Sequence, residues 1–484
     1  MTSLKEKTLK GTLWTLIEQF SGKAFGFIIQ IYLARLLMPE DYGLIAMVVI
    51  FIGIGTSIME SGFGQSLIRT KKPSEADFSS VFYINILMSI AVYILIYITA
   101  PFVSDFYDES SLTFILRVLA LIIVIRSFYL VQQTIMTINL DFKKQMIVNL
   151  ISTIIGGCTA TLIAFQGYGV WALVFMQLIS NSLMALLFWY FGKWKPKRIF
   201  DLDRVKHHFS FGYKLMLNTF VNSICNYIFD IVIGKFYSSS ILGFYNRAST
   251  YQKFPTILLG RSINRVTYPM FSKLTDSKIQ MKQALKRINK LVIYVYTPFM
   301  FLLIFNAKQI IVILLTEKWL PVVPIFQILC LGGLLQPIQY YNTNIIKSLG
   351  DSALLLKINF FSRLFTVIGL FVIINYGFYH LIAFQAISMV LVTFCFMWYS
   401  GLKINYNLLE QFKDILVDLS ISFLISVLCF YMNNILNLSN VWSLIFYSVC
   451  FLILYIVFSD LFKLESYTFI KNLVTNDLLR KIKK

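Results

Sequence analysis

The sequence predicts an all-α, multi-pass membrane protein with about fourteen transmembrane helices. Of the 484 residues, 58% are hydrophobic and only 14% are charged, and a soluble domain of this size could not bury so much apolar surface. The apolar residues are gathered in stretches of about 20 or more, the length that a helix needs to cross a bilayer. Lysines and arginines concentrate in alternate loops, the pattern typical of helices inserted with their basic ends inside.

The fourteen predicted segments follow one another through most of the chain. The eighth and ninth are interrupted by charged residues and prolines, among them Lys253, Pro255 and Pro298, so twelve or thirteen is the alternative number. In order, the segments are residues 11–36, 43–65, 78–102, 112–138, 146–166, 169–191, 209–234, 240–271, 283–306, 322–347, 352–375, 377–400, 414–433 and 440–461.

The basic loops orient the chain. One side of the predicted membrane carries basic clusters in nearly every loop, whereas the other has only Arg35, Lys235, Lys308 and Lys318 and includes the acidic loops 39–41 and 104–109. The positive-inside rule then places both termini in the cytoplasm. The net charge of +20 is mostly this orientation signal with a contribution at the lipid surface, and no nucleic-acid partner is expected.

An internal repeat organises the chain into two halves. Residues 34–45 align without gaps on 234–245, an offset of 200, and residues 168–173 align on 376–381. The repeat unit contains six spans, an even number, which predicts two parallel six-helix lobes related by a pseudo-two-fold axis along the membrane normal. The expected domains are an N-terminal lobe of 1–200, a C-terminal lobe of 201–405, and helices 13 and 14 with a basic cytoplasmic tail in 406–484.

Basic residues outnumber acidic ones inside the predicted spans. Charges are costly in hydrocarbon and normally face a bundle interior or a watery cavity on a transport route, so the excess of cations indicates an anionic cargo. The basic set is Lys23, Arg117, Arg126, Lys214, Arg247, Lys253, Arg261, Arg265, Lys290, Lys357 and Arg363, and the acidic set is Glu18, Glu60, Asp230 and Asp418.

The seventh segment has the clearest polar stripe. Five polar residues recur at four-residue spacing: Lys214, Asn218, Asn222, Asn226 and Asp230. Each step of four residues rotates about 40° beyond a full turn, so the five side chains form a stripe that winds slowly along one side of the helix. A water-filled path and interhelical hydrogen bonding between asparagines are the two interpretations.

Arginines supply candidate phosphate ligands, because their planar forks of donors match phosphate oxygens. Arg247, Arg261 and Arg265 fall within about 40° of one another on an ideal helix, although snorkelling to the surface is an alternative for Arg265. In the fourth segment, Arg126 and Arg117 point to opposite faces. Further polar candidates in the second half are Gln339 in the tenth segment and Asn359 and Arg363 in the eleventh.

Two acids allow ion coupling. Glu18 and Asp230 lie in the first helix of each half, where they would meet across a pseudo-two-fold cavity and bind Na⁺ or carry a proton. The alternative is that each neutralises a nearby base. The histidines lack metal-ligand spacing and no Walker sequence is present, so we expect no metal, no cofactor and no enzymatic activity.

Four motifs carry a resemblance to a known family. They are Lys10-Gly-Thr-Leu-Trp14, the turn Arg35-Leu-Leu-Met-Pro-Glu-Asp-Tyr-Gly43, Gly62-Phe-Gly-Gln-Ser-Leu-Ile68 and Leu242-Gly-Phe-Tyr-Asn-Arg-Ala248. Together they resemble the polysaccharide-transporter branch of the multidrug/oligosaccharidyl-lipid/polysaccharide exporter superfamily, which contains the Wzx-type flippases for O-antigen, capsule or exopolysaccharide. The similarity covers about the first 400 residues.

The resemblance implies two lobes around a cationic cavity and a function in the bacterial inner membrane. Such proteins move an undecaprenyl-diphosphate-linked oligosaccharide from the cytoplasmic to the periplasmic leaflet by alternating access. On this basis Arg247, Arg261, Arg126 and Arg363 would bind the diphosphate, and Asn218, Asn222, Asn226, Gln339 and Asn359 would line the sugar path. Candidate protein partners are a glycan polymerase and other glycan-assembly proteins.

Two other functions are alternatives. A multidrug exporter driven by Na⁺ or H⁺ would need an acidic cavity for cationic drugs, which the excess of intramembrane bases disfavours. A membrane glycan polymerase or ligase usually needs an extended outer loop, whereas the predicted outer loops here are short.

Overall fold

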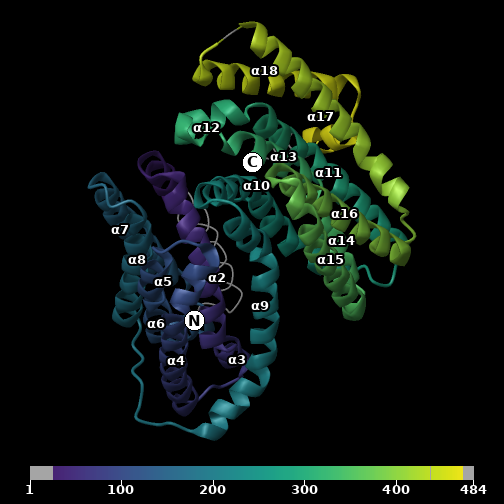
Figure 1. Cartoon of the computed structure of the whole chain (residues 1–484). Coiled ribbons are helices and arrows are strands. Elements are labelled where there is room, and N and C mark those ends of the chain that lie inside the picture. Colours follow the sequence, from purple (N-terminus) through teal and green to yellow (C-terminus); the bar gives the residue numbers. More distant parts are fainter. Residues whose placement is uncertain (1–24, 437, 473–484) are drawn as a thin grey trace, which may run out of the picture. The chain divides into compact units, whose positions relative to one another are not determined.

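The computed structural model describes residues 25–436 and 438–472, apart from the side chains of residues 257–266. Within these limits the chain is built of helices and loops, and no β-strand is found among the described residues (Figure 1). Its internal contacts divide the chain into two compact units, Met1–Asn246 and Arg247–Lys484. Each unit is described by itself.

The first unit contains long membrane helices and several shorter ones. Helix α9 packs against α2, α3 and α4, and α7 pairs with α8. After a helical segment at Phe25–Leu36, the elements are α2 (Pro39–Glu60), α3 (Phe63–Arg69), α4 (Glu75–Tyr107), α5 (Leu112–Leu119), α6 (Leu121–Ile138), α7 (Phe142–Phe165), α8 (Val170–Phe191), α9 (Leu202–Phe236) and the beginning of α10 (Ser239–Ser272).

The second unit begins within α10. Helix α11 packs against α17, and α16 packs against α13 and α14. The elements after α10 are α11 (Lys278–Phe305), α12 (Ala307–Leu315), the 3₁₀ turn Glu317–Trp319, α13 (Val322–Gly333), α14 (Gln336–Ser348), α15 (Ser352–Ile373), the 3₁₀ turn Ile374–Tyr376, α16 (Phe378–Ile404), α17 (Leu408–Leu436) and α18 (Asn440–Leu461). Residues 465–472 form one more helical stretch.

Twelve described helices are long and apolar enough to cross a membrane. They correspond to twelve of the fourteen predicted segments. The described part of the first segment is the short apolar helix Phe25–Leu36, and the eighth is α10, which is helical from Ser239 to Ser272 but too polar for this criterion. The all-α membrane architecture is confirmed. The number fourteen, the arrangement of the lobes and the predicted domain boundaries stay predictions.

Local sequence signals set the beginnings of several helices. Pro39 occupies the first turn of α2, where its missing N–H is not needed, and Asp41 Oδ2 accepts a hydrogen bond from the backbone N–H of Met38 at 2.9 Å. Ser74 and Asp77 form a reciprocal capping box at the start of α4, which satisfies two otherwise unpaired backbone donors. These caps mark the residues at which α2 and α4 begin.

The repeated turns of the two halves contact each other inside the first unit. Glycine lets the two backbones approach: a Cβ on Gly43 would collide with the backbone of Ser239, and a Cβ on Gly243 would collide with that of Pro39. Alongside them, Ser240 Oγ donates a hydrogen bond to Glu40 Oε1 at 2.9 Å. Each contact joins a residue near position 40 to one near position 240, so the aligned segments of the repeat pack reciprocally.

Candidate functional site

Helix α9 positions the polar stripe. The helix begins after Asp201, whose carboxylate Oδ1 accepts hydrogen bonds from the backbone N–H groups of Asp203 (2.9 Å) and Arg204 (3.3 Å). From there it continues without interruption to Phe236. A continuous helix keeps the four-residue spacing of the stripe in register over its whole length.

The stripe stays accessible over most of this helix. Lys214, Asn218 and Asn226 are exposed, whereas Asn222 and Asp230 are half-buried. Asn222 Nδ2 donates to Asn218 Oδ1 at 3.2 Å, so this hydrogen bond runs along one helix and does not join two helices. Asparagines that hold helices together are expected to be covered by the neighbouring helix. Asn218 and Asn226 are not covered in this way, and the polar path along the stripe stays a prediction.

Asp230 lies at the more covered end of the stripe. It interacts electrostatically with the phenol groups of Tyr107 in α4 and Tyr227 in α9. Glu18, the other predicted ion-coupling residue, lies outside the residues that the structure describes. Coupling through Glu18 and Asp230 therefore stays a prediction, and so does the alternative that each neutralises a nearby base.

Arg126 has a partner that sequence reasoning did not assign. Its Nη2 lies 2.8 Å from Oε1 of Glu60, the last residue of α2, and the two side chains are 39% and 32% exposed. The sequence places Glu60 among the intramembrane acids, but no local pattern connects it with a residue 66 positions later. The ion pair is partly accessible, so Arg126 keeps donors that an anion could reach.

Arg117 faces another neighbour, as its nine-residue separation from Arg126 predicts. Its Nε donates to the backbone carbonyl of Tyr97 at 3.2 Å, and the guanidinium carbon lies 4.2 Å from the centre of the Tyr97 ring. This cation–π contact holds the side chain of Arg117, a residue of α5, against α4. Arg117 and Arg126 therefore do not share one site in the first unit.

Arg247 is a covered cation. Only 7% of the residue is exposed, and it interacts electrostatically with Tyr251, one turn farther along α10. A guanidinium so deeply buried is costly unless it is compensated. The predicted companion Arg261 belongs to the same helix, but its side chain lies outside the description.

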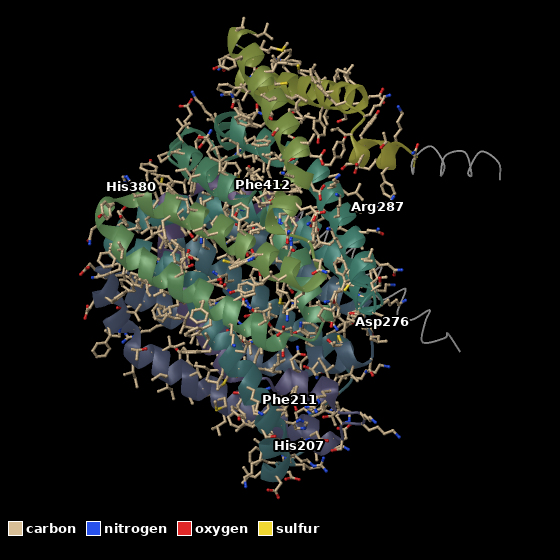
Figure 2. All side chains as sticks on the ribbon, turned by 90° about the vertical axis from the view of Figure 1, so that its right-hand side faces the viewer. His207, Phe211, Asp276, Arg287, His380 and Phe412 are labelled. Atoms are coloured by element: carbon tan, nitrogen blue, oxygen red, sulfur yellow. The ribbon has the colours of Figure 1, made fainter. Side chains whose placement is uncertain are left out.

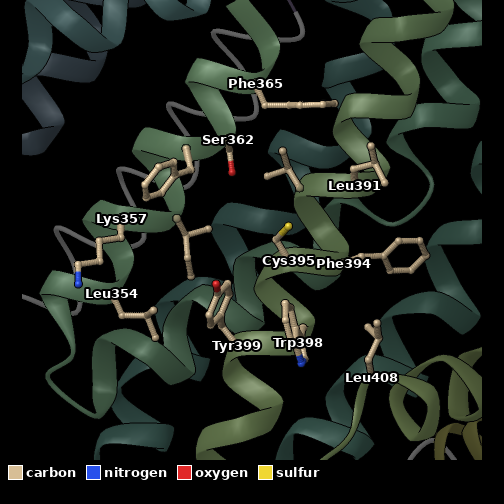
Figure 3. Close-up of a pocket in the computed structure, with 13 residues that line it drawn as sticks. Leu354, Lys357, Ser362, Phe365, Leu391, Phe394, Cys395, Trp398, Tyr399 and Leu408 are labelled. Atoms are coloured by element: carbon tan, nitrogen blue, oxygen red, sulfur yellow. The ribbon is translucent and has the colours of Figure 1, made fainter. Parts of the chain in front are cut away.

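The remaining predicted residues lie on α14 and α15. Gln339, Asn359 and Arg363 are all half-buried. Beside them, α15 and α16 enclose a groove of about 700 Å³ that is lined mainly by apolar and aromatic side chains, with Lys357 at its edge (Figure 3). Lys357 is one of the predicted intramembrane bases, and its exposure shows that not every such base is enclosed by the helices around it.

A buried ionic cluster at the start of α9 was not predicted. His208 is fully buried; its Nδ1 lies 2.8 Å from Ser66 Oγ and its Nε2 lies 3.3 Å from Asp77 Oδ1. The same carboxylate oxygen accepts from Arg204 Nη1 at 2.8 Å. These bonds fasten α9 to α3 and α4. The sequence signals only that His207 and His208 are adjacent, which does not reveal partners 131 and 142 residues away.

Two curated proteins illustrate what the chain is similar to. It is 25% identical over 376 residues to the teichuronic acid biosynthesis protein TuaB of Bacillus subtilis, covering 77% of this chain and 78% of that protein. It is 23% identical over 342 residues to the lipopolysaccharide biosynthesis protein WzxC of Escherichia coli, covering 69% of each.

The fold is similar to that of a solved transporter. The lipid II flippase MurJ in an inward closed conformation superposes with a TM-score of 0.72 at 16% identity, covering 93% of this chain and 98% of the other. At this identity the likeness establishes the fold. The model of the polysaccharide biosynthesis protein family matches residues 32–324, more than half of the chain, in agreement with the resemblance drawn from the sequence motifs. The chain therefore belongs to the polysaccharide biosynthesis protein family.

Proposed function

We propose that this protein is a flippase that moves an undecaprenyl-diphosphate-linked oligosaccharide from the cytoplasmic to the periplasmic leaflet by alternating access. The cargo is an O-antigen, capsule or exopolysaccharide repeat unit. The observation that carries the proposal is the polar stripe of α9, in which Asn218 and Asn226 remain exposed on a membrane helix. Amide side chains that helix packing has not covered can exchange hydrogen bonds with sugar hydroxyls.

The similar proteins support a lipid-linked glycan as the cargo. They are a teichuronic acid biosynthesis protein, a lipopolysaccharide biosynthesis protein and a lipid II flippase. Moving a charged, sugar-bearing headgroup through hydrocarbon unaided meets a large desolvation penalty. A polar path with fixed cations replaces the lost hydration and so lowers that barrier.

The proposed roles follow from the chemistry of the side chains. Arg247, Arg261, Arg126 and Arg363 are proposed to bind the diphosphate, since guanidinium groups form paired hydrogen bonds with phosphate oxygens. Because Arg126 is paired with Glu60, the diphosphate would compete with that carboxylate for its donors. The proposed sugar path consists of Asn218, Asn222, Asn226, Gln339 and Asn359.

Ion coupling is proposed to involve Glu18 and Asp230, with Na⁺ or H⁺ as the driving ion. A glycan polymerase and other glycan-assembly proteins are the proposed protein partners. The proposed location is the bacterial inner membrane with both termini in the cytoplasm, because the basic loops lie on that side.

The test is the leaflet location of the polyprenyl-diphosphate-linked oligosaccharide in cells depleted of this protein. Sugars that are reachable from outside are labelled chemically, and surface glycan is measured in parallel. A flippase predicts that the lipid-linked repeat accumulates on the cytoplasmic side while surface glycan disappears. Re-expression of the intact chain should restore both.

Two other outcomes would contradict the proposal. If single repeats accumulate on the outer side, the protein acts after translocation, as a polymerase or ligase would. If glycan export is unchanged and cells become sensitive to cationic drugs, a multidrug exporter replaces the flippase. The excess of basic over acidic residues in the predicted spans argues against the second outcome.

A further inference from the structure

A cavity of about 530 Å³ lies in the second unit, between the first half of α11 and the helical residues 465–472. It is separate from the residues proposed above for the glycan. Figure 2 labels Arg287, one of its lining residues, close to the C-terminal helical segment. The other lining residues are Gln283, Lys286, Lys290, Leu291, Glu465, Ser466, Thr468, Phe469 and Asn472.

The cavity is lined by an excess of positive charge. Lys286, Arg287 and Lys290 contribute three cations, and Glu465 is the one carboxylate among its lining residues. Positions 283, 287 and 290 are three and four residues apart, so they share one face of α11. Gln283 and the neighbouring basic side chains of α11 therefore line the same side of the cavity.

Two of the three cations are held by carboxylates. Lys286 Nζ lies 2.8 Å from Asp414 Oδ1 in α17, and Lys290 Nζ lies 2.6 Å from Glu465 Oε2 and 3.6 Å from Asp414 Oδ1. These pairs fix both lysines at the wall of the cavity. The ammonium groups keep further donors, because each has three hydrogens.

Arg287 is placed differently. It is exposed, and its guanidinium carbon lies 4.2 Å from the centre of the Phe469 ring. Among the residues that the structure describes, no carboxylate forms an ion pair with it. Stacking on a ring orients the guanidinium plane while leaving its edge donors available. Arg287 therefore has the geometry of a preorganised anion ligand.

The opposite wall is anchored to the membrane helices. Leu464 is buried in a cluster with Ile425 of α17 and Tyr455 of α18. Ser466 Oγ donates to Asp418 Oδ2 at 3.3 Å, and Lys471 Nζ lies 2.7 Å from Asp460 Oδ1. The segment that carries Phe469 is thus held by its own contacts, and the cavity does not depend on a ligand to form.

We propose that this cavity binds the phosphate headgroup of an anionic phospholipid of the surrounding membrane. Helices α11 and α17 are both candidate membrane spans. The cavity lies along the first half of α11, toward the N-terminal end of that helix, where lipid headgroups can reach the protein. Basic pockets of this kind between membrane helices bind anionic headgroups. Leu291 and Phe469 offer the glycerol and the first acyl carbons an apolar surface beside the cations.

The experiment measures binding to the full-length protein purified in a neutral detergent. The probe is a short-chain phosphatidylglycerol, compared with the phosphatidylcholine of the same chain length and with inorganic phosphate, and the readout is the Kd of each. We expect phosphatidylglycerol to bind more tightly than phosphatidylcholine. R287Q should weaken phosphatidylglycerol binding by about tenfold, which corresponds to about 1.4 kcal/mol, because it removes charge-assisted hydrogen bonds to the phosphate.

Three further variants serve as controls for the binding assay. K278Q removes an exposed basic residue of α11 that does not line the cavity and should leave binding unchanged. R287K keeps the charge but loses the planar fork and should fall between the wild type and R287Q. Q283E adds a carboxylate at an exposed lining position and should weaken binding while the protein stays folded.

Several results would overturn the proposal. They are equal binding of the two phospholipids, equal binding by the wild type and R287Q, or the same loss with K278Q as with R287Q. Binding of inorganic phosphate alone, with no preference between the lipids, would make the cavity a free-anion site. Because the assay requires no transport, a failed export experiment and a failed lipid experiment are distinguishable.

Discussion

Gly43 and Gly243, 200 residues apart, pack against one another at the start of α2 and α10. A Cβ on Gly243 would lie 3.3 Å from the backbone nitrogen of Gly43, and a Cβ on either glycine would collide with the backbone of the opposite turn. Both positions belong to the aligned segments of the internal repeat. A reciprocal contact between equivalent residues is what a local two-fold relationship produces.

This contact predicts a specific loss of stability. G43A and G243A should each destabilise the protein by about 1–3 kcal/mol, the usual cost of overpacking a tightly fitted site. Thermal unfolding of the purified variants measures the effect. G53A is the matched control on α2, because its Cβ would meet only Tyr227 Cε2 at 4.0 Å, an ordinary contact. Equal stability of G43A and G53A would show that the two backbones are not held at this distance.

A cross-link between α2 and α10 should test alternating access. Glu40 and Ser240 are joined by a hydrogen bond, so cysteines at these positions, in a chain freed of its six native cysteines, should react with a short bifunctional reagent. If this contact opens during transport, the cleavable cross-link stops glycan export and cleavage restores it. Each single-cysteine variant treated with the same reagent is the control. Export that continues at full rate in the cross-linked protein would rule out movement at this contact.

The Arg126–Glu60 ion pair can be tested by comparing the single variant R126Q with the double variant R126Q/E60Q. R126Q should reduce glycan export at least tenfold, because it removes a proposed diphosphate ligand and leaves Glu60 uncompensated. The double variant R126Q/E60Q restores neutrality, so it separates substrate binding from simple charge balance. We expect export to remain low in the double variant while protein levels in the membrane recover. Full recovery of export would show that Arg126 only neutralises Glu60 and does not bind the diphosphate.

Arg247 is expected to be essential. R247A should abolish glycan export while the protein remains in the membrane, because a covered cation on α10 is a proposed ligand of the diphosphate. R117Q provides the comparison, since Arg117 stacks on Tyr97 and is not among the proposed diphosphate ligands, and it should export normally. Surface glycan and membrane protein are measured in the same cells. Normal export by R247A would remove Arg247 from the diphosphate site.

The sequence predicts which polar residues share a helix face, but it does not predict the ion-pair partners of the charged residues. The four-residue spacing of Asn218, Asn222 and Asn226 appears in the sequence because one helix imposes it. By contrast, the sequence predicts Lys290 only as a base within a membrane segment, and the structure shows it paired with Asp414 and Glu465. Those carboxylates lie more than 120 residues farther along the chain, where no local pattern links them to α11.

The sequence by itself determined the class of the protein, the polar face of α9 and the repeat that aligns Gly43 with Gly243. These features depend on local properties: the length of apolar runs, the periodicity of a helix and similarity between two segments. The tertiary structure decided which charges are paired, how closely the repeated turns approach and where α11 meets the C-terminal segment to form a cavity. Ion pairs, close packing and cavities depend on distances between residues far apart in the chain, and these are set only when the helices pack.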